Sequence, residues 1–517
     1  MRNAARSACL LLLLASCRGS ATRAPEQLLE SADPAPQART PVASATATAR
    51  PMDPQPGALD IGDPYFPGLG NGGYDVEHYR LDLDVDFTSD ELVATAIVRA
   101  RALQDLSSFS LDLYGLEVTN VAVDGASAQF ERGGTTEGSQ GKPPIATELV
   151  VKPAKPIATG TVFETTVEYH GWPDGRPDPS FPMMNVGWRP SDSGIYVVSE
   201  CTGASSWYPC NDHPRDKATY EFHVTVDEPY VVAANGILAE EQDLGDRRTF
   251  VWKASEPMAS YLATVDIAEF DRLVLEHPRG LPVVIYHPND ATEEELAPFR
   301  RQVEILDFLE SAFGPYPFES AGGIVSYEQI GGALECQTAP VYGRGMNEEV
   351  IVHELAHQWF GDCVSPALWR DMWLNEGFAS YAEWLWTEKH RGADAYEERA
   401  KETYRRLRQR KVGSPFDPGV QRVFSSRVYV RGAFVLHGLR KEIGPEAFTE
   451  LMKTWVQTFH EANGSTEGFV TLASKVAGRD LKPFFDAWLY SEVTPEIPEY
   501  GPVEELPAGG ERRREGG

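Results

Sequence analysis

Apolar and polar residues alternate along much of the first half of the chain. From Tyr79 to Phe87 the order is Tyr-Arg-Leu-Asp-Leu-Asp-Val-Asp-Phe, which places every second residue on one apolar face, as in a half-buried strand. Glycine, aspartate and proline separate similar runs at 92–100, 109–113, 118–123, 149–151, 162–169, 220–226 and 248–252. We therefore predict an antiparallel β domain over residues 59–270.

The pattern changes to a helical period from about Glu293. Apolar residues then recur at spacings of three and four, which predicts helices over 299–313, 350–360, 373–386, 395–410 and 428–439, and through 484–488. The predicted fold class is α+β with two domains, in which the N-terminal β domain is followed by a mainly helical domain over residues 271–498. The charged run from Glu511 to Glu515 indicates a disordered tail over residues 499–517.

The first 58 residues differ in composition from the rest of the chain. Arg2 and Arg6 precede a short apolar run, and residues 14–17, Leu-Ala-Ser-Cys, are typical of a bacterial lipoprotein signal over residues 1–17. Cleavage would leave Cys17 first, ready to carry a lipid anchor. The alternatives are an ordinary secretory leader or a start site placed too early. Residues 18–58 are rich in proline, alanine and threonine, which predicts a flexible, disordered tether.

This N-terminus predicts an exported protein of the bacterial cell envelope, periplasmic or at the cell surface, which contacts the membrane only through Cys17. No later segment is apolar enough to span a bilayer. The length allows two or three domains, and the charge of −30 argues against nucleic acid as a partner.

A candidate metal site lies in the second half, where His353, Glu354 and His357 form the pattern His-Glu-x-x-His. On a helix, residues four apart share a face, so the two histidines can bind one ion while Glu354 lies beside a bound water. Catalytic zinc usually has three protein ligands, and Glu376 in the predicted helix 373–386 can be the third. We therefore predict one Zn²⁺ per chain, with Glu354 as the general base of a metallopeptidase.

The alternative for this motif is a chance match on a solvated helix face. The apolar residues 350–352 and 359–360 flank the motif, which indicates a buried helix. Buried histidines and glutamates without a ligand or partner would be destabilising, which favours the zinc site.

Longer segments resemble the gluzincin aminopeptidases, the family of aminopeptidase N and leukotriene hydrolase. The resemblance rests on HELAHQWFGD at 353–362 and WLNEGFASY at 373–381, and it runs in order from about His78 to about Trp488. It implies a thermolysin-like catalytic domain and aminopeptidase activity on peptides with a free N-terminus. The larger family members carry further C-terminal domains that this chain does not show, so we expect a more open cleft. We also expect a monomer.

Other segments suggest residue roles through the same resemblance. Residues 332–336, GALEC, resemble the family's GAMEN segment, which implies that Glu335 binds the substrate amine and that Gly332 and Ala333 belong to a substrate-binding loop. Leu334 and Cys336 depart from the family's methionine and asparagine. A segment that begins at Glu200 resembles the signature of the second amine-binding glutamate, and Tyr429 occupies the place of the catalytic tyrosine.

The residues alone leave other interpretations open. Glu335 could be a structural ion-pair partner, Glu200 a solvated strand end and Tyr429 a core aromatic residue. If either glutamate is only structural, a gluzincin endopeptidase is the alternative. A non-catalytic peptide-binding or assembly protein is a further alternative, against which the intact metal motif argues.

The remaining candidates are predicted to be structural. We interpret His437 as a structural histidine and Glu383 as a solvated helix acid, with a contact to a zinc ligand as its alternative. A disulfide between Cys201 and Cys336 is one hypothesis, but free buried thiols are the expectation for the four cysteines beyond the leader: Cys201, Cys210, Cys336 and Cys363.

Overall fold

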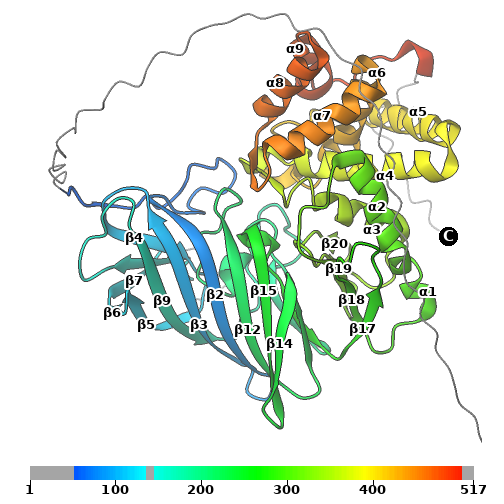
Figure 1. The fold of residues 1–517 in the computed structure, drawn as a ribbon. Helices are drawn as coiled ribbons and strands as arrows, with labels where there is room; N and C mark the ends of the chain where they lie inside the picture. The colour runs from blue at the N-terminus through cyan, green and yellow to red at the C-terminus, as the bar shows by residue number, and fades with distance from the viewer. Residues whose placement is uncertain (1–51, 135–144, 503–517) are drawn as a thin grey trace, which may run out of the picture. The chain divides into compact units, whose positions relative to one another are not determined.

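The computed structural model describes residues 52–134 and 145–502 (Figure 1). The predicted leader, the tether up to residue 51 and the tail from residue 503 lie outside the described residues. Within the described ranges, no helix has both the length and the apolar character needed to cross a membrane.

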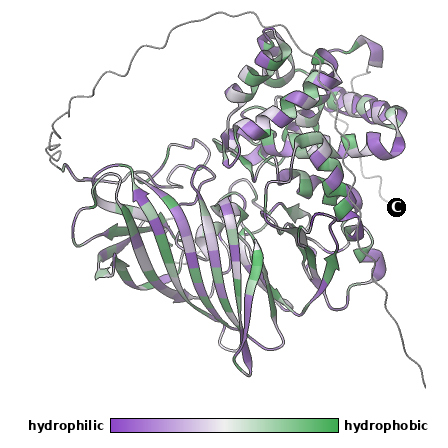
Figure 2. Cartoon of the chain, viewed as in Figure 1, coloured by the Kyte–Doolittle hydropathy of each residue, from purple (hydrophilic) through white to green (hydrophobic). Residues whose placement is uncertain are grey.

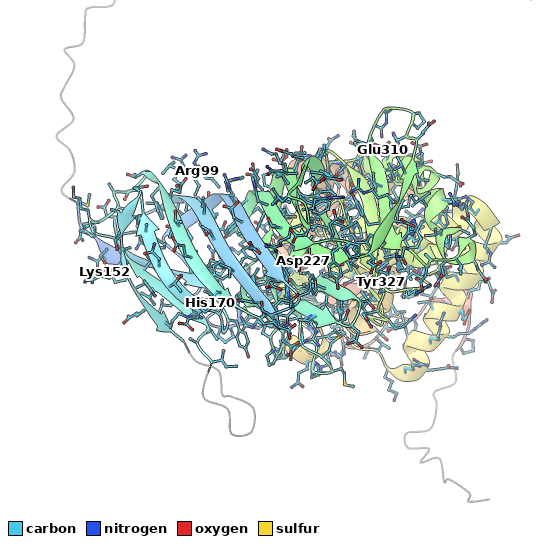
Figure 3. All side chains as sticks on the ribbon, turned by 90° about the horizontal axis from the view of Figure 1, so that it is seen from below. Arg99, Lys152, His170, Asp227, Glu310 and Tyr327 are labelled. Atoms are coloured by element: carbon cyan, nitrogen blue, oxygen red, sulfur yellow. The ribbon has the colours of Figure 1, made fainter. Side chains whose placement is uncertain are left out.

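The first half is built around an eight-stranded sheet, whose strands lie side by side in Figure 1 and alternate between hydrophilic and hydrophobic residues in Figure 2. The strand order is β14 (Ile237–Asp243), β15 (Arg247–Ala259), β12 (Lys217–Asp227), β2 (Tyr74–Asp86), β3 (Glu91–Ala102), β9 (Val162–Gly171), β5 (Glu117–Val123) and β6 (Ala126–Ser127). Leu81, Leu83 and Val85 of β2 are buried, as their alternation predicts. Arg99 projects from the other face (Figure 3) and pairs with Glu77 at 3.2 Å.

The predicted β domain is confirmed as β-rich, but it is not purely antiparallel. Strands β2 and β12 run parallel in the middle of the large sheet. Hydrophobic alternation reports which face of a strand is buried and carries no information about the direction of its neighbour, so the sequence pattern could not show this.

Two smaller sheets complete the first half. One has the order β1 (Gln55–Pro56), β4 (Leu106–Asp112), β8 (Glu148–Lys152) and β7 (Gln129–Gly133); the other has the order β10 (Gly187–Ser191), β11 (Gly194–Val198), β16 (Val265–Ala268) and β13 (Val231–Ala234). The pairing of β1 with β4 shows ordered chain at Gln55, three residues before the predicted end of the tether. Strand β11 ends two residues before Glu200.

The second half contains a five-stranded sheet that the sequence analysis missed. Its order is β17 (Phe270–Leu275), β18 (Val283–Pro288), β19 (Ala321–Val325), β21 (Val341–Tyr342) and β20 (Ala333–Leu334). All five residues of β19 are buried, so this strand has no polar face and no alternation to detect. Strand β20 leads directly into Glu335.

Helices form the rest of the second half, as predicted (Figure 1). They are α1 (Glu293–Leu296), α2 (Gln302–Phe313), α3 (Glu348–His357), α4 (Trp373–Arg391), α5 (Ala393–Arg410), α6 (Gly432–Ile443), α7 (Pro445–Thr458), α8 (Thr466–Ala477) and α9 (Lys482–Phe485), with π-helical turns at Arg427–Arg431 and Asp486–Tyr490 and a short strand pair of β22 (Val364–Pro366) and β23 (Ala462–Gly464). Helix α3 begins after Asn347, whose side chain caps it by accepting a hydrogen bond from Val350 N at 3.2 Å.

Helices α4 and α6 approach each other at two glycines. A Cβ atom on Gly432 would lie 2.8 Å from Cα of Gly377, closer than real Cβ atoms approach a backbone. Because both residues are glycine, the two backbones can touch, and the π-helical turn before α6 is held against α4. This contact places Tyr429 beside Glu376.

A half-buried lysine connects the first half of the chain to the turn after α3. The Lys217 ammonium on β12 donates to the carbonyl oxygens of Asp362 and Cys363 at 2.7 and 3.0 Å. These carbonyls belong to the turn that follows α3, which ends at His357. The helix that carries His353 and His357 is therefore fixed in part by the β-rich half.

Candidate metal centre and amine site

Helices α3 and α4 bring together the three predicted metal ligands. His353 Nε2 lies 3.0 Å and His357 Nε2 lies 3.4 Å from Oε2 of Glu376. All three donor atoms lie within 4.8 Å of one another, and the three side chains are buried. Tetrahedral zinc with bonds of about 2.0–2.1 Å separates its ligand atoms by roughly 3.3 Å, so this His₂Glu set fits the ion.

The other ring nitrogen of each histidine has its own acceptor. His353 Nδ1 lies 2.9 Å from Glu383 Oε1, and His357 Nδ1 lies 3.0 Å from the carbonyl oxygen of Phe360. A carboxylate or carbonyl only accepts, so Nδ1 of each ring donates to it, and Nε2 of each neutral ring is then the atom that would bind the metal. The tautomers suited to metal binding are thus set by the fold.

The environment of Glu383 differs from the one predicted. It was expected to be a solvated helix acid, yet its side chain is only 18% exposed and contacts His353. Its second oxygen accepts a hydrogen bond from Arg399 of α5 at 2.6 Å. Arg399 therefore holds the carboxylate that orients a metal ligand.

A Glu383→Gln variant is expected to bind zinc about 10- to 100-fold more weakly, because the neutral amide no longer polarises the His353 ring or pairs with Arg399. Zinc dissociation constants measured by competition with a chromogenic chelator check this. Glu388→Gln is the matched control, because Glu388 lies on the same helix and pairs with Arg440 at 2.7 Å, away from the cluster. Equal zinc affinity in the Glu383 variant and the control would contradict the role.

The charges of the ligand cluster are interdependent. Burial by itself raises the pKa of Glu376, but the neighbouring His357 and His353 outweigh burial and hold this pKa well below its usual value. Burial by itself lowers the pKa of His357, yet Glu335 and Glu376 together raise it to about 9. Glu376 is therefore present as the carboxylate that a cation requires.

A cavity of about 480 Å³ opens onto this cluster and contains the other predicted catalytic residues. Glu354 lines the cavity, and burial is the main cause that raises its pKa to about 7. The Tyr429 hydroxyl donates to Glu376 Oε1 at 2.7 Å, and its ring stacks on the His353 ring at 5.9 Å between centroids. Tyr429 is thus a cavity residue and not a core aromatic.

Glu200 and Glu335 also line this cavity, together with Gly332 and Ala333. Glu335 is 2% exposed and accepts a hydrogen bond from the Tyr261 hydroxyl at 3.4 Å. Oε1 of Glu200 is buried without a hydrogen-bond partner. Burial raises the pKa of both carboxyls, and for Glu200 the nearby Glu335 raises it further. Among the described residues that line the cavity, no lysine or arginine pairs with these two carboxylates, and an ammonium group would supply that cation.

Two residues that support Glu335 were not found from the sequence. Tyr261, after β15, donates to its carboxylate, and the Gln358 amide, directly after α3, donates to its backbone carbonyl at 3.2 Å. Tyr261 belongs to no motif with a recognisable spacing. Gln358 lies within the HELAHQWFGD segment, but the motif does not show that its side chain contacts Glu335.

The residues predicted to be structural behave in that way. His437 is buried between the hydroxyl groups of Tyr396 and Tyr500, each at 2.8 Å. The cysteines Cys201, Cys210, Cys336 and Cys363 are free and buried. The hypothesis of a disulfide between Cys201 and Cys336 is therefore wrong in this structure.

The β-rich half, the helical half and the buried His₂Glu cluster define a zinc metallopeptidase. Two family models match the chain in order: the peptidase M1 N-terminal domain at residues 75–262 and the peptidase family M1 domain at residues 319–488. The chain belongs to peptidase family M1. The resemblance seen in the motifs is thus confirmed.

Solved structures and curated relatives agree with this assignment. A crystal structure of an M1 zinc metallopeptidase mutant from Deinococcus radiodurans bound to a Tyr-Ser-Ala substrate is 30% identical, with a TM-score of 0.76, and covers 85% of this chain and 100% of that chain. Leukotriene A-4 hydrolase of Xenopus laevis is 26% identical over 76% of this chain and 67% of the relative. Glutamyl aminopeptidase of Bitis rhinoceros is 26% identical over 56% of this chain, which spans only 33% of that relative.

Proposed function

We propose that this chain is a zinc aminopeptidase that hydrolyses the first peptide bond of peptides with a free α-amine. The observation that carries the proposal is the position of two carboxylates in the same cavity as the His₂Glu cluster: Glu335 is buried, and Glu200 has a buried Oε1 atom without a hydrogen-bond partner. An ammonium group between them satisfies the unpartnered Glu200 oxygen and neutralises the repulsion between the two acids.

The relatives support this activity. Two of the curated relatives are named as a glutamyl aminopeptidase and a leukotriene A-4 hydrolase, and solved structures of M1 zinc metallopeptidase mutants hold L-tryptophan, L-arginine or a Tyr-Ser-Ala substrate. The two structures named as two-domain M1 zinc metallopeptidases are covered over 99% of their length, so the comparison with them spans both domains.

The chain's own residues have separate tasks in this reaction. Zinc bound by His353, His357 and Glu376 would supply a Lewis acid that polarises the scissile carbonyl and lowers the pKa of water. Glu354 accepts the proton of the attacking water at its carboxylate and passes it to the leaving amine.

Tyr429 and the two amine-binding glutamates position and stabilise the reacting groups. The Tyr429 hydroxyl turns from Glu376 to donate to the oxygen that becomes negative at the attacked carbonyl. Glu200 and Glu335 fix the amine, so one residue separates the amine from the cleaved bond.

The decisive experiment compares aminoacyl fluorogenic amides with their N-acetylated counterparts on the zinc-loaded protein. We expect the acetylated substrates to react about 10⁴-fold more slowly, because they leave two buried carboxylates without a cation. Equal cleavage of both would support the gluzincin endopeptidase instead. No cleavage at full zinc occupancy would support the non-catalytic binding protein.

We further propose that the protein is exported and anchored to a membrane of the bacterial cell envelope by lipid on Cys17. The Leu-Ala-Ser-Cys sequence at 14–17 supports this proposal, and the proline-rich segment that follows would let the enzyme stand away from the membrane. A Cys17→Ser variant expressed in a bacterial host should move from the membrane fraction to the soluble fraction. An unchanged distribution would contradict the anchor.

We also propose that the enzyme acts as a monomer. All residues of the candidate site come from one chain, so no second copy is needed to complete it. Light scattering on the purified protein should give a mass near 57.1 kDa, minus any leader that is removed. A dimeric mass at assay concentration would contradict this.

A further inference from the structure

We propose that Asp178 is a positioning residue for Glu200, and that it holds the turn from which Glu200 reaches the substrate amine. This inference rests on the proposed aminopeptidase function and assigns a further residue to it. Asp178 belongs to the segment 172–186 that joins β9 to β10, and it is not among the described residues that line the active-site cavity. It therefore acts through the turn at Glu200 and not through contact with the substrate.

The position of the Glu200 carboxylate depends on its backbone. Its Oε1 atom is buried and has no hydrogen-bond partner, whereas Glu335 accepts a hydrogen bond from the Tyr261 hydroxyl. The backbone at Glu200 forms a turn in which Gly203 N donates to the carbonyl oxygen of Ser199 at 2.7 Å. A residue that fixes this turn therefore also fixes the carboxylate.

Asp178 is connected to both residues that follow Glu200. Its Oδ2 atom accepts a hydrogen bond from the Thr202 hydroxyl at 2.8 Å. Its Oδ1 atom accepts from the backbone N–H of Ser180 at 2.7 Å and also from the Ser180 hydroxyl. Because that hydroxyl donates its only proton to Asp178, the Cys201 thiol is the donor in the contact of 3.8 Å between Cys201 Sγ and Ser180 Oγ. One carboxylate thus holds Cys201 and Thr202.

The segment that carries Asp178 is itself fixed at its base. Arg176 and Val186 form an isolated β-bridge, with N···O distances of 2.8 and 2.9 Å. Phe181 N donates to the carbonyl oxygen of Asp178 at 3.1 Å, which closes a turn at this residue. Asp178 is 3% exposed, so water competes little for its hydrogen bonds. Its carboxylate is therefore a fixed point that holds the Glu200 turn.

The Glu200 turn needs such an anchor because other acids lie near it. Burial is the largest cause that raises the pKa of Glu200, and the charges of Glu335, Glu376 and Glu354 raise this pKa further. These like charges favour displacement of the Glu200 carboxylate away from Glu335. The hydrogen bonds to Asp178 oppose that displacement, so the pair of glutamates is in place before the ammonium binds.

The charge of Asp178 does not favour the amine site. It is a smaller cause that raises the pKa of Glu200, so it opposes the ionised form that an ammonium requires. The benefit of Asp178 is therefore the geometry of its hydrogen bonds. An asparagine here would keep an oxygen for the Ser180 donors, and its amide could donate to the Thr202 hydroxyl oxygen. Asparagine can thus replace Asp178 in positioning Glu200, whereas alanine cannot.

The first test compares zinc-loaded wild type and Asp178→Ala on a leucyl coumarin amide and on its N-acetylated counterpart. We expect KM for the free amine to rise about 10- to 100-fold and kcat to stay within about threefold, because amine binding contributes equally to the ground state and the transition state. The acetylated amide does not use Glu200, so its kcat/KM should change less than about twofold. An equal loss on both substrates, or an unchanged KM, would overturn the proposal.

Conservative variants separate the hydrogen bonds from other effects of the mutation. Thr202→Val keeps the size of the side chain but removes one donor, and should raise KM about tenfold. Thr202→Ser and Asp178→Asn should both stay within about twofold of wild type. Asp174→Ala is the matched control, because Asp174 lies on the same segment, has a side chain that is 74% exposed and pairs with Arg189 at 2.9 Å. A KM as high in Asp178→Asn as in Asp178→Ala would contradict positioning by hydrogen bonds.

A double-mutant cycle tests whether Asp178 acts through Glu200. In a Glu200→Ala background, Asp178→Ala should change KM less than about twofold, because the carboxylate that it positions is already absent. The same 10- to 100-fold rise in both backgrounds would show an independent route and overturn the proposal. Equal cleavage of free and acetylated amides by the zinc-loaded wild type would instead contradict the proposed function itself, so the two failures are distinguishable.

Discussion

A Glu354→Gln variant is expected to keep its zinc and to lose about 10²- to 10⁴-fold in kcat. The amide keeps the size of the side chain but cannot accept the proton of the attacking water. Glu354 is not one of the three ligand residues that lie around Oε2 of Glu376, so the metal site stays intact. Steady-state kinetics on a Leu amide, together with elemental analysis of zinc, measures both quantities on one sample.

The matched control for this variant is Glu348→Gln. Glu348 begins the same helix and accepts a hydrogen bond from Trp386 Nε1 at 2.7 Å, outside the cavity lining. Its variant should retain nearly full activity. If a zinc-replete Glu354→Gln protein turns over at a near-normal rate, another group is the base.

Removal of zinc by a chelator should reduce activity to background and lower the melting temperature. His353, His357 and Glu376 are buried, and a bound ion would hold together the two Nε2 atoms and the Oε2 atom that face one another at 3.0 and 3.4 Å. An ion that binds only the native state stabilises it by about 2.7 kcal/mol when its free concentration is 100 times its Kd.

Differential scanning calorimetry and the amide assay follow the two effects, and added zinc should restore both. A chelator already saturated with zinc is the control for non-specific inhibition. Activity that persists in protein shown by elemental analysis to be metal-free would exclude zinc from the reaction.

The metal ligands could be predicted because their geometry is local. His353 and His357 are four residues apart on one helix, so the helical repeat alone brings them together. Glu376 was assigned as a third ligand from the usual ligand count and a second helical pattern, and the structure places it at 3.0 and 3.4 Å from the two histidines.

The role of Glu383 could not be predicted from local spacing alone. Its spacing of seven from Glu376 places both residues on one face of α4, but whether that face meets solvent depends on α5, which supplies Arg399. Such a packing partner leaves no pattern near Glu383 in the sequence. The same holds for Tyr261, whose contact with Glu335 joins segments 74 residues apart.

The large features of the fold were predictable for a related reason. Half-buried strands such as β2 and amphipathic helices such as α5 each have one solvent-exposed face. The periodic spacing of their polar and apolar residues therefore predicts them. Strand β19 is buried on both faces, so its sequence shows no alternation of polar and apolar residues. The partner and direction of each strand, as in the parallel pair of β2 and β12, are also decided by contacts distant in sequence.

The two glutamates proposed to bind the substrate amine come from different domains of the chain. Glu200 belongs to the segment matched by the N-terminal domain model, while Glu335 and the metal ligands belong to the segment matched by the peptidase domain model. A polypeptide of residues 271–498 would contain the complete metal cluster, yet it would lack Glu200 and the Lys217 contact to the turn after α3. If the proposed aminopeptidase function holds, such a fragment would keep the hydrolytic groups but lose one of the two carboxylates that restrict cleavage to the first peptide bond.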